Sequence, residues 1–372
     1  MAWKRRSPGR GLAIGLILAG LLASRSTAQG ARTYVRNSQG QRPRPVVAVD
    51  NVCAWPNLTV LGDGTITAVG FNRPSHGGVV GDIDCWASED GGRTWEKRGT
   101  PGPHDSPDSN RVNHAAGLGP GGELIVLCSG TTNVRPPRPF RFLQPWVSRS
   151  SDGGRTWSID KSAAPEKTPD GQMWIPFGDI LAGDDGALRV AVYTAAAHGP
   201  RNDRVFILRS RDGGKSWGEF VPLDPDNLRN ETALLHLGGG KWLAAARTSG
   251  LHLYESGDDA KTWRYRGPVT KAAQHPGHLL RLRDGRILLS YGNRAGADKG
   301  VEVLFSDDKG ATWKGPLRVS DWRGDGGYPS SVQLPDGRVL TAYYARRIAG
   351  HDQYHLGVVT WDPETSLEAK PE

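Results

Sequence analysis

The chain has 372 residues and a formal net charge of +8, and it is rich in Gly (50) and Trp (13) but has only 2 Met. Beyond the N-terminus no long segment has the 3.6-residue periodicity of a helix, which excludes a helical bundle. Four basic residues belong to the N-terminal segment and the rest are scattered, without an aromatic-interleaved basic stripe, so we expect no nucleic-acid partner.

The cysteines and the metal-ligating residue types add two exclusions. Cys53, Cys85 and Cys128 are odd in number and widely spaced, which argues against a disulfide framework and predicts buried free thiols. No run of His, Cys, Asp or Glu has the spacing of metal ligands. We therefore expect no metal and no cofactor.

The N-terminal segment predicts export. Basic residues precede an apolar run at residues 12–23, and a small polar stretch follows that ends at Ala28. This is the pattern of a secretory signal peptide cleaved after Ala28, and the run is short for a membrane span. We expect a secreted or periplasmic protein, with no stable membrane insertion after cleavage: residues 1–28 signal peptide, 29–44 lead-in, 45–362 one domain and 363–372 a tail.

Six hairpins are predicted along the domain. Each is a pair of apolar runs around a Gly-containing turn, which is typical of antiparallel strands. They cover residues 57–69, 115–129, 179–194, 232–247, 278–291 and 330–344.

A second pattern, Ser-x-Asp-x-Gly-x-Thr-Trp, follows five of these hairpins. Its near-copies stand at residues 88–95, 150–157, 210–217, 256–263 and 306–313. Ser and Asp side chains bond nearby backbone N–H groups and Gly takes a positive φ, so the pattern predicts a self-satisfied turn between strands. Five copies cannot all be one active site, which makes a structural role the better interpretation.

Two hairpins per unit make a four-stranded blade, so six units predict an all-β, six-bladed β-propeller. The sixth unit lacks the turn motif but supplies strands at residues 343–345 and 354–361. Residues 46–49 are expected to complete that last blade and to close the ring. We expect a monomer.

The turn glycines locate a pocket, because the residue before each innermost strand should face the propeller axis. Nine positions before the six glycines stand Trp55, Asn113, Phe177, Glu231, Pro276 and Tyr328; near the far ends of the hairpins stand Phe71, Arg73, Ser129, Tyr193, Arg247, Arg294, Tyr344 and Arg346. Close to these positions lie His76, Asp82, Asp84, Asn110, Arg111, His114, Asp179, His275 and His278.

This constellation has a chemical interpretation. Guanidinium groups bind a carboxylate in bidentate fashion, so the arginines suit an acidic sugar. A Tyr beside a Glu can be a nucleophile, because the carboxylate accepts a phenol proton that a lone Tyr would keep at neutral pH. A further Asp would protonate the leaving group. We therefore predict Tyr328, Glu231, and Asp82 or Asp84 as catalytic residues. The predicted glycan-binding residues are Arg247, Arg294, Arg73, Arg111, Asn113, His114, Trp55 and His278.

The repeated turn resembles the Asp-box of the sialidase (neuraminidase) superfamily, over nearly the whole domain. The segments 230–232 and 246–247 resemble those that carry the sialidase Glu and one carboxylate-binding Arg; 327–330 resembles the segment of the nucleophilic Tyr, and 291–294 that of another Arg. The region 71–84 matches, more loosely, the one that holds the acid. The resemblance implies a secreted exo-α-sialidase that removes a terminal acidic sugar from glycoconjugates with retention.

One departure keeps alternatives open. Sialidases open the first blade with a motif that carries the first of three arginines, and Ala54 stands at that place here. The alternatives are another glycosidase, a lyase for uronate polymers that uses Tyr328 with His114 or His278, and a glycan-binding propeller without catalysis.

Overall fold

The computed structural model describes residues 32–132, 141–195, 203–348 and 350–371. The predicted signal peptide, at residues 1–28, and the first residues of the lead-in lie outside the described part. In the unit Arg32–Glu372 the described residues form mainly β-strands, with one short helix, α1 (Pro363–Leu367). No helix within the described ranges is both long enough and apolar enough to span a membrane.

Four sheets of the unit have four strands each. The first holds β2 (Cys53–Val60), β3 (Ile66–Phe71), β4 (Ile83–Ser88) and β5 (Glu96–Gly102). Another holds β14 (Thr232–Gly238), β15 (Lys241–Arg247), β16 (Leu251–Ser256) and β17 (Arg264–Pro268). A third holds β18 (Gln274–Arg281), β19 (Ile287–Asn293), β20 (Gly300–Ser306) and β21 (Lys314–Asp321). The last holds β22 (Arg323–Gln333), β23 (Val339–Ile348), β24 (His351–Trp361) and β1 (Val46–Asp50).

The remaining strands form one eight-stranded sheet in the order β13-β12-β11-β10-β6-β7-β8-β9. One half holds β6 (Ser109–Leu118), β7 (Leu124–Thr132), β8 (Arg141–Ser150) and β9 (Ser158–Asp160). The other half holds β10 (Met173–Ala182), β11 (Leu188–Ala195), β12 (Val205–Ser210) and β13 (Gly218–Pro222).

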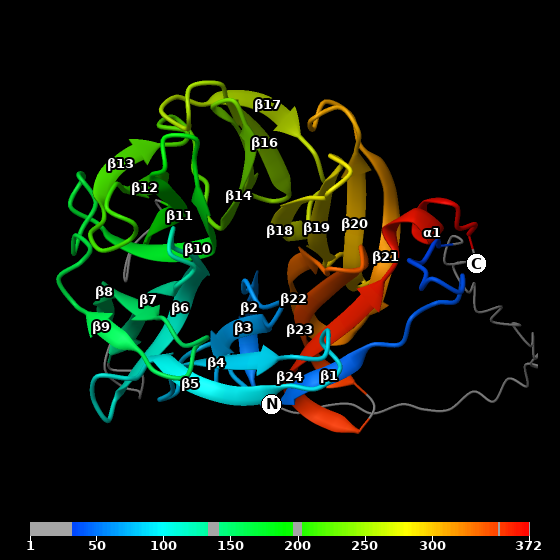
Figure 1. Cartoon of the computed structure of the whole chain (residues 1–372), viewed down its shortest axis with the longest axis horizontal. Helices are drawn as coiled ribbons and strands as arrows, with labels where there is room; N and C mark the ends of the chain where they lie inside the picture. The colour runs from blue at the N-terminus through cyan, green and yellow to red at the C-terminus, as the bar shows by residue number, and fades with distance from the viewer. Residues whose placement is uncertain (1–31, 133–140, 196–202, 349, 372) are drawn as a thin grey trace, which may run out of the picture. The chain divides into compact units, whose positions relative to one another are not determined.

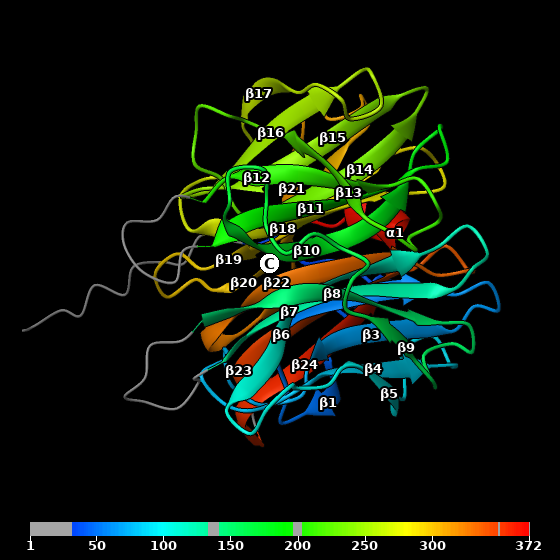
Figure 2. The same cartoon turned by 90° about the vertical axis from the view of Figure 1, so that its left-hand side faces the viewer.

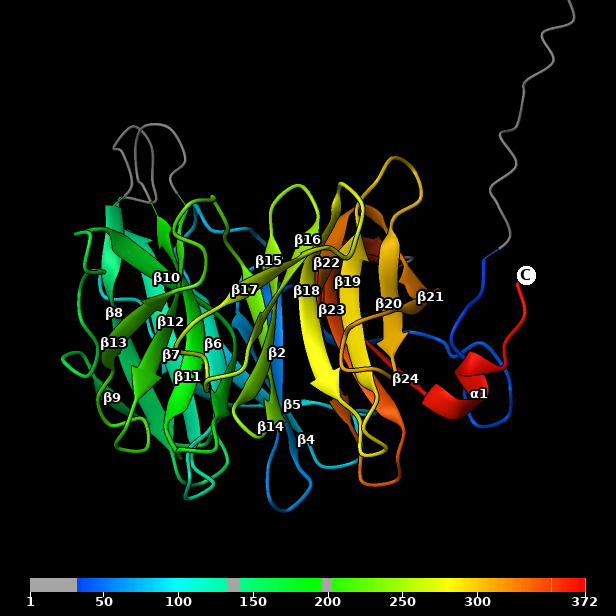
Figure 3. The same cartoon turned by 90° about the horizontal axis from the view of Figure 1, so that it is seen from above.

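The sheets stand around a common centre in a propeller-like arrangement (Figure 1). The strands β2, β6, β10, β14, β18 and β22 lie innermost, and β5, β9, β13, β17, β21 and β1 lie outermost (Figures 1 and 3). The all-β prediction is therefore confirmed, and the expected inner strands are the ones that surround the axis.

The prediction of six separate four-stranded sheets was wrong, because β6 and β10 join two of the expected blades. Residues Gly178, Asp179 and Ile180 of β10 pair in parallel with β6, and Figure 2 views the structure from the side on which this sheet lies. Gly117 of β6 makes this approach possible, since a Cβ there would lie only 2.2 Å from the Ile180 carbonyl oxygen. The absence of one side chain thus fuses two expected blades into a single sheet.

The last sheet is completed as the sequence predicts. Val46, Val47, Val49 and Asp50 of β1 pair antiparallel with β24, so the start of the domain supplies the outer strand of its final sheet. The predicted strands at 343–345 and 354–361 lie within β23 and β24. This pairing closes the ring between the two ends of the domain.

The Asp-box turns join the third and fourth strands of their units, and in each copy the Ser and Asp side chains bond within the turn. In the second copy the Asp152 carboxylate accepts from the Ser150 hydroxyl at 2.7 Å and from the Thr156 N–H at 2.9 Å. The Ser150 hydroxyl in turn accepts from the Gly154 N–H at 2.8 Å, and the Trp157 indole N–H donates to the Gly154 carbonyl at 2.9 Å. The prediction of a structural turn is confirmed.

The fourth copy departs from the pattern, and one of its residues also binds side chains outside the turn. Asp259 and Ala260 replace the two glycines yet keep positive φ, at 64° and 60°. The Asp259 carboxylate accepts from the Trp242 indole N–H at 2.8 Å and lies 2.9 Å from the guanidinium of Arg189, which is fully buried. The turn therefore accepts backbone strain while Asp259 provides a carboxylate partner for a buried cation.

Hydrophobic clusters fill the spaces between neighbouring sheets, and the three cysteines lie in them. Cys53, Cys85 and Cys128 are buried thiols that form no disulfide within the described part of the chain, as predicted. Burial raises the pKa of both the Cys85 and the Cys128 thiol to about 12, so these thiols are unreactive packing groups.

Candidate active site

Three side chains from two parts of the ring form one hydrogen-bonded group. Tyr328 lies in β22, Glu231 directly precedes β14, and Arg247 ends β15. The Tyr328 hydroxyl donates to Glu231 Oε1 at 2.5 Å. Arg247 Nη1 donates to the same hydroxyl at 3.0 Å and also forms an ion pair with Glu231 Oε2. The Glu231–Tyr328 distance is within the hydrogen-bond reach that a nucleophile and its base require.

Burial sets the protonation of this group. Tyr328 and Glu231 are both 7% exposed. Burial, followed by the negative charge of Glu231, raises the pKa of Tyr328 well above its ordinary value. Burial lowers the pKa of Arg247, but the adjacent Glu231 and Tyr328 outweigh it and raise that pKa. Tyr328 is therefore a phenol at rest, and its proton must pass to Glu231 during any attack.

The backbone places two aromatic rings at the pocket in an unusual conformation. Tyr328 has a φ of 53° and Trp55 a φ of 57°, in the left-handed region that few large residues adopt. Their rings meet edge to face with centroids 5.5 Å apart, and the Phe177 ring lies 6.2 Å from Tyr328. Strained residues of this kind cluster at functional sites. These rings form an apolar wall next to the Tyr328 hydroxyl.

A second polar cluster surrounds Asp325, three residues before Tyr328. Its carboxylate forms an ion pair with Arg294 and accepts from His76 Nε2 at 2.7 Å. The hydroxyls of Tyr354 and Tyr344 donate to Asp325 Oδ2 at 3.0 and 3.2 Å. Burial would raise the pKa of Asp325, but these partners outweigh it and lower the pKa, so the group stays ionised.

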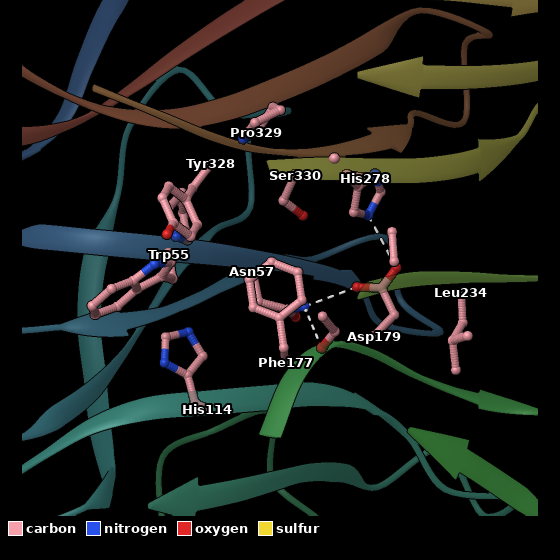
Figure 4. Close-up of a pocket in the computed structure, with 14 residues that line it drawn as sticks. Trp55, Asn57, His114, Phe177, Asp179, Leu234, His278, Tyr328, Pro329 and Ser330 are labelled. Carbon is pink, nitrogen blue, oxygen red and sulfur yellow. Dashed lines mark hydrogen bonds and ion pairs between the residues drawn. The ribbon is translucent and has the colours of Figure 1, made fainter. Parts of the chain in front are cut away.

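A third network lies deeper on the axis, in the pocket that Tyr328 also lines. Asp179 accepts from Asn57 Nδ2 at 2.8 Å and from His278 Nε2 at 3.0 Å (Figure 4). Because the Ser331 N–H donates to His278 Nδ1 at 3.3 Å, the imidazole proton is on Nε2. The network joins β2, β10 and β18 across the axis, and both nitrogens of His278 are occupied.

The family model for the BNR repeat-like domain matches residues 139–341. The chain belongs to this family, within the sialidase superfamily. A sialidase from Micromonospora viridifaciens is 31% identical over 226 residues, which are 59% of this chain and 30% of that protein. The chain thus spans less than a third of the length of that curated relative.

Solved structures share the fold. A protein of unknown function from Dyadobacter fermentans matches with a TM-score of 0.72 and 24% identity, over 87% of this chain and 99% of that one. The Hadza microbial sialidase Hz136 matches with a TM-score of 0.65 and 18% identity, over 85% and 66%. Trypanosoma rangeli sialidase matches with a TM-score of 0.63 and 19% identity, over 91% and 58%.

The two carboxylates considered as the acid of this BNR-repeat protein have different surroundings. Asp84 is buried, with Lys97 Nζ at 2.7 Å and the Thr100 hydroxyl at 2.7 Å. Asp82 is more accessible, with 20% of its side chain exposed, and His104 donates to it through its backbone N–H at 2.7 Å. Burial would raise the pKa of Asp82, but the hydrogen bonds from His104 lower it.

Two of the arginines expected to bind substrate have other partners. Arg111 is buried, and its guanidinium donates to Asp105 at 2.8 Å and to the Gln144 carbonyl at 2.7 Å. It stacks on the Trp146 ring at 3.7 Å. Arg73 is exposed and donates to the Val80 carbonyl at 3.3 Å. Neither guanidinium is therefore directed at the Tyr328 hydroxyl in this structure.

The remaining predicted residues lie near the axis. Trp55, His114 and His278 line the pocket with Tyr328, whereas Asn113 is half-buried opposite Ser129 of β7. Burial lowers the pKa of His114 to about 4, so this imidazole is neutral and a poor base. The lyase alternative loses support, since it needs His114 or His278 to exchange a proton with the substrate.

Two residues gained importance from the structure. Asp325 belongs to no motif, and its only signal in the sequence is its place three residues before Tyr328. His275 adjoins Arg247 and Arg294; burial, together with these two cations, lowers its pKa to about 4. It is therefore a neutral group between two cations at physiological pH.

Proposed function

We propose that this BNR-repeat protein is a sialidase-like glycoside hydrolase that removes a terminal sugar from a glycan with retention at the anomeric carbon. The observation that carries the proposal is the 2.5 Å hydrogen bond from the buried Tyr328 hydroxyl to Glu231 Oε1. A phenol and a carboxylate in this contact are the nucleophile and base that a Tyr-dependent retaining glycosidase needs.

The proposed first step forms a bond between the Tyr328 oxygen and the anomeric carbon while the bond to the leaving group breaks. The phenol proton passes to Glu231, and Arg247, 3.0 Å from the phenol oxygen, stabilises the negative charge that develops there. In the second step water attacks the same carbon and gives a proton to the carboxylate that protonated the leaving group, while Tyr328 leaves and takes its phenol proton back from Glu231. Two displacements at one carbon give net retention.

We assign the leaving-group proton to Asp82. Asp84 is the weaker candidate because Lys97 and Thr100 already use its two oxygens. A substrate that displaces His104 from Asp82 would leave burial as the main influence, and the pKa of Asp82 would then rise toward that of a proton donor.

Two structural expectations belong to the same proposal. Each half of the eight-stranded sheet acts as one blade, so that six repeat units surround the substrate. The N-terminal segment directs export, which would bring the enzyme to glycans in a secreted or periplasmic location. The sialidases among its relatives make a sialoside the first substrate to test. Arg247 and Arg294 both pair with carboxylates of the protein, however, which favours a neutral sugar.

The test is turnover of a panel of 4-methylumbelliferyl glycosides, sialoside and neutral sugars included, by the wild type and by Tyr328→Phe. Tyr265→Phe is the matched control, since Tyr265 is 48% exposed on the outer strand β17. We expect Tyr328→Phe to lose roughly a millionfold in kcat, as for other nucleophile losses, and Tyr265→Phe to keep full activity. Equal loss in both variants, or none in Tyr328→Phe, would reject the mechanism.

A further inference from the structure

The arginine expected to receive a substrate carboxylate already binds one from the protein. Arg294 forms its ion pair with Asp325, and its Nη2 also lies 3.4 Å from the Tyr344 hydroxyl. The Arg294 guanidinium lies 5.8 Å from the centre of the Tyr328 ring, so this occupied cation is beside the proposed nucleophile.

Asp325 is built into the site. His76, Tyr344 and Tyr354 donate to it from three different segments, and the His76 ring packs on the rings of Tyr344 and Tyr354 at 5.1 and 5.3 Å. Its side chain is nevertheless 30% exposed, so a ligand can reach it. The four groups that donate to Asp325, from Arg294, His76, Tyr344 and Tyr354, keep its carboxylate ionised and fix its position.

The charges at the nucleophile therefore balance. Arg247 pairs with Glu231, and Arg294 pairs with Asp325. The sequence has Ala54 where the resemblance places a third arginine, and the guanidinium groups of Arg73 and Arg111 have other acceptors. A substrate carboxylate at Arg294 would have to displace Asp325 or lie against it, and like charges in contact are unfavourable.

Resting on the proposed function, we propose that Asp325 takes the place of the substrate carboxylate and selects a neutral terminal sugar. A hydroxyl group of such a sugar donates to Asp325 Oδ1, which accepts from Arg294, because His76, Tyr344 and Tyr354 already donate to Oδ2. The sugar ring packs on the aromatic wall of Trp55 and Phe177. A neutral nucleophile also remains appropriate, because Asp325 supplies near Tyr328 the negative charge that an acidic substrate would otherwise bring.

Arg346 is the alternative partner for an anion. It is exposed at the end of β23, and its guanidinium lies 5.4 Å from the centre of the Tyr354 ring. If an acidic sugar used Arg346 in place of Arg294, the pocket would still prefer a carboxylate. The test must therefore separate the two arginines.

The experiment is calorimetric binding of the methyl α-glycoside of N-acetylneuraminic acid and of its methyl ester, which differ in one charge. For the wild type we expect the acid to bind no more tightly than the ester. In Asp325→Asn the acid-to-ester affinity ratio should rise about tenfold, since Arg294 becomes free for a charge-assisted pair. The control Asp336→Asn, which loses the partner of Arg338 in a hairpin turn, should leave the ratio unchanged.

Three results would overturn the proposal. The first is a wild type that binds the acid tenfold or more tightly than the ester, whether or not Arg346→Ala removes that preference. The second is an unchanged acid-to-ester affinity ratio in Asp325→Asn, and the third is no acid binding by that variant. If Asp325→Asn does not fold, the wild-type ratio and Asp325→Ser decide. Binding needs no turnover, so these outcomes are independent of Tyr328→Phe and of the proposed hydrolysis.

Discussion

Replacement of Glu231 by Gln should destabilise the protein as well as inactivate it. The Glu231 side chain is 9% exposed and that of Arg247 is 21% exposed, so the pair is largely removed from water. Loss of one partner of a buried ion pair costs about 3–5 kcal/mol, and the solvent access of Arg247 places our expectation just below that range, at about 2–3 kcal/mol. Gln still accepts the Tyr328 hydrogen bond, so the change isolates the charge.

The assay is equilibrium unfolding in urea of the wild type, Glu231→Gln, Arg247→Met and the double variant. We expect the double variant to lose less free energy of unfolding than the two single variants lose together, with a coupling energy of about 1–3 kcal/mol. The exposed pair of Asp307 and Lys314 is the control, and Asp307→Asn should cost under about 1 kcal/mol. A Glu231–Arg247 coupling no larger than experimental error would refute this electrostatic reasoning.

Three further predictions address the fold and the axis. Asp259→Ala should lower the free energy of unfolding by about 2–4 kcal/mol, because the buried Arg189 loses a carboxylate partner and the Trp242 indole its acceptor; urea unfolding checks this, and a neutral result would mean that Asp185 alone satisfies Arg189. Burial would raise the pKa values of Asp212 and Asp258, but the hydrogen bonds within each Asp-box outweigh it and lower both pKa values to about 2. These carboxylates therefore contribute stability that is complete above the ordinary carboxyl pKa and is lost as the pH falls toward 2. A urea midpoint that stays constant from pH 5 to 2.5 would contradict this. His278→Ala should weaken the network that crosses the axis and lower thermal stability, whereas His278→Gln, which keeps a donor for Asp179, should restore part of it in a calorimetric scan.

The regular parts of the fold could be predicted from sequence because their causes are local. Each hairpin carries its own turn glycine and apolar runs, and each Asp-box contains the donors and acceptors of its own turn, as Ser150 and Asp152 show. A count from the turn glycines also placed Glu231 and Tyr328 at corresponding strand ends. Their hydrogen bond then follows from the way the inner strands converge on the axis.

What the sequence did not reveal depends on contacts between distant segments. The fusion of β6 and β10 rests on the close approach of Gly117 to Ile180, which no pattern within either strand indicates. Asp325 attracts partners from residues 76, 294, 344 and 354, so its importance appears only when those segments meet. Asp82 directly precedes β4 and Asp84 lies in it, two positions further on, and only their neighbours His104 and Lys97 distinguish them.

The most direct test of the account is to trap the glycosyl-enzyme with the ring-fluorinated form of whichever glycoside the protein turns over, followed by peptide mass spectrometry. The account predicts a single added glycosyl group on the peptide that contains Tyr328, absent from Tyr328→Phe and present with Tyr265→Phe. An adduct on Glu231 or Asp82, or a product with inverted anomeric configuration by NMR, would contradict the claim that Tyr328 is the nucleophile.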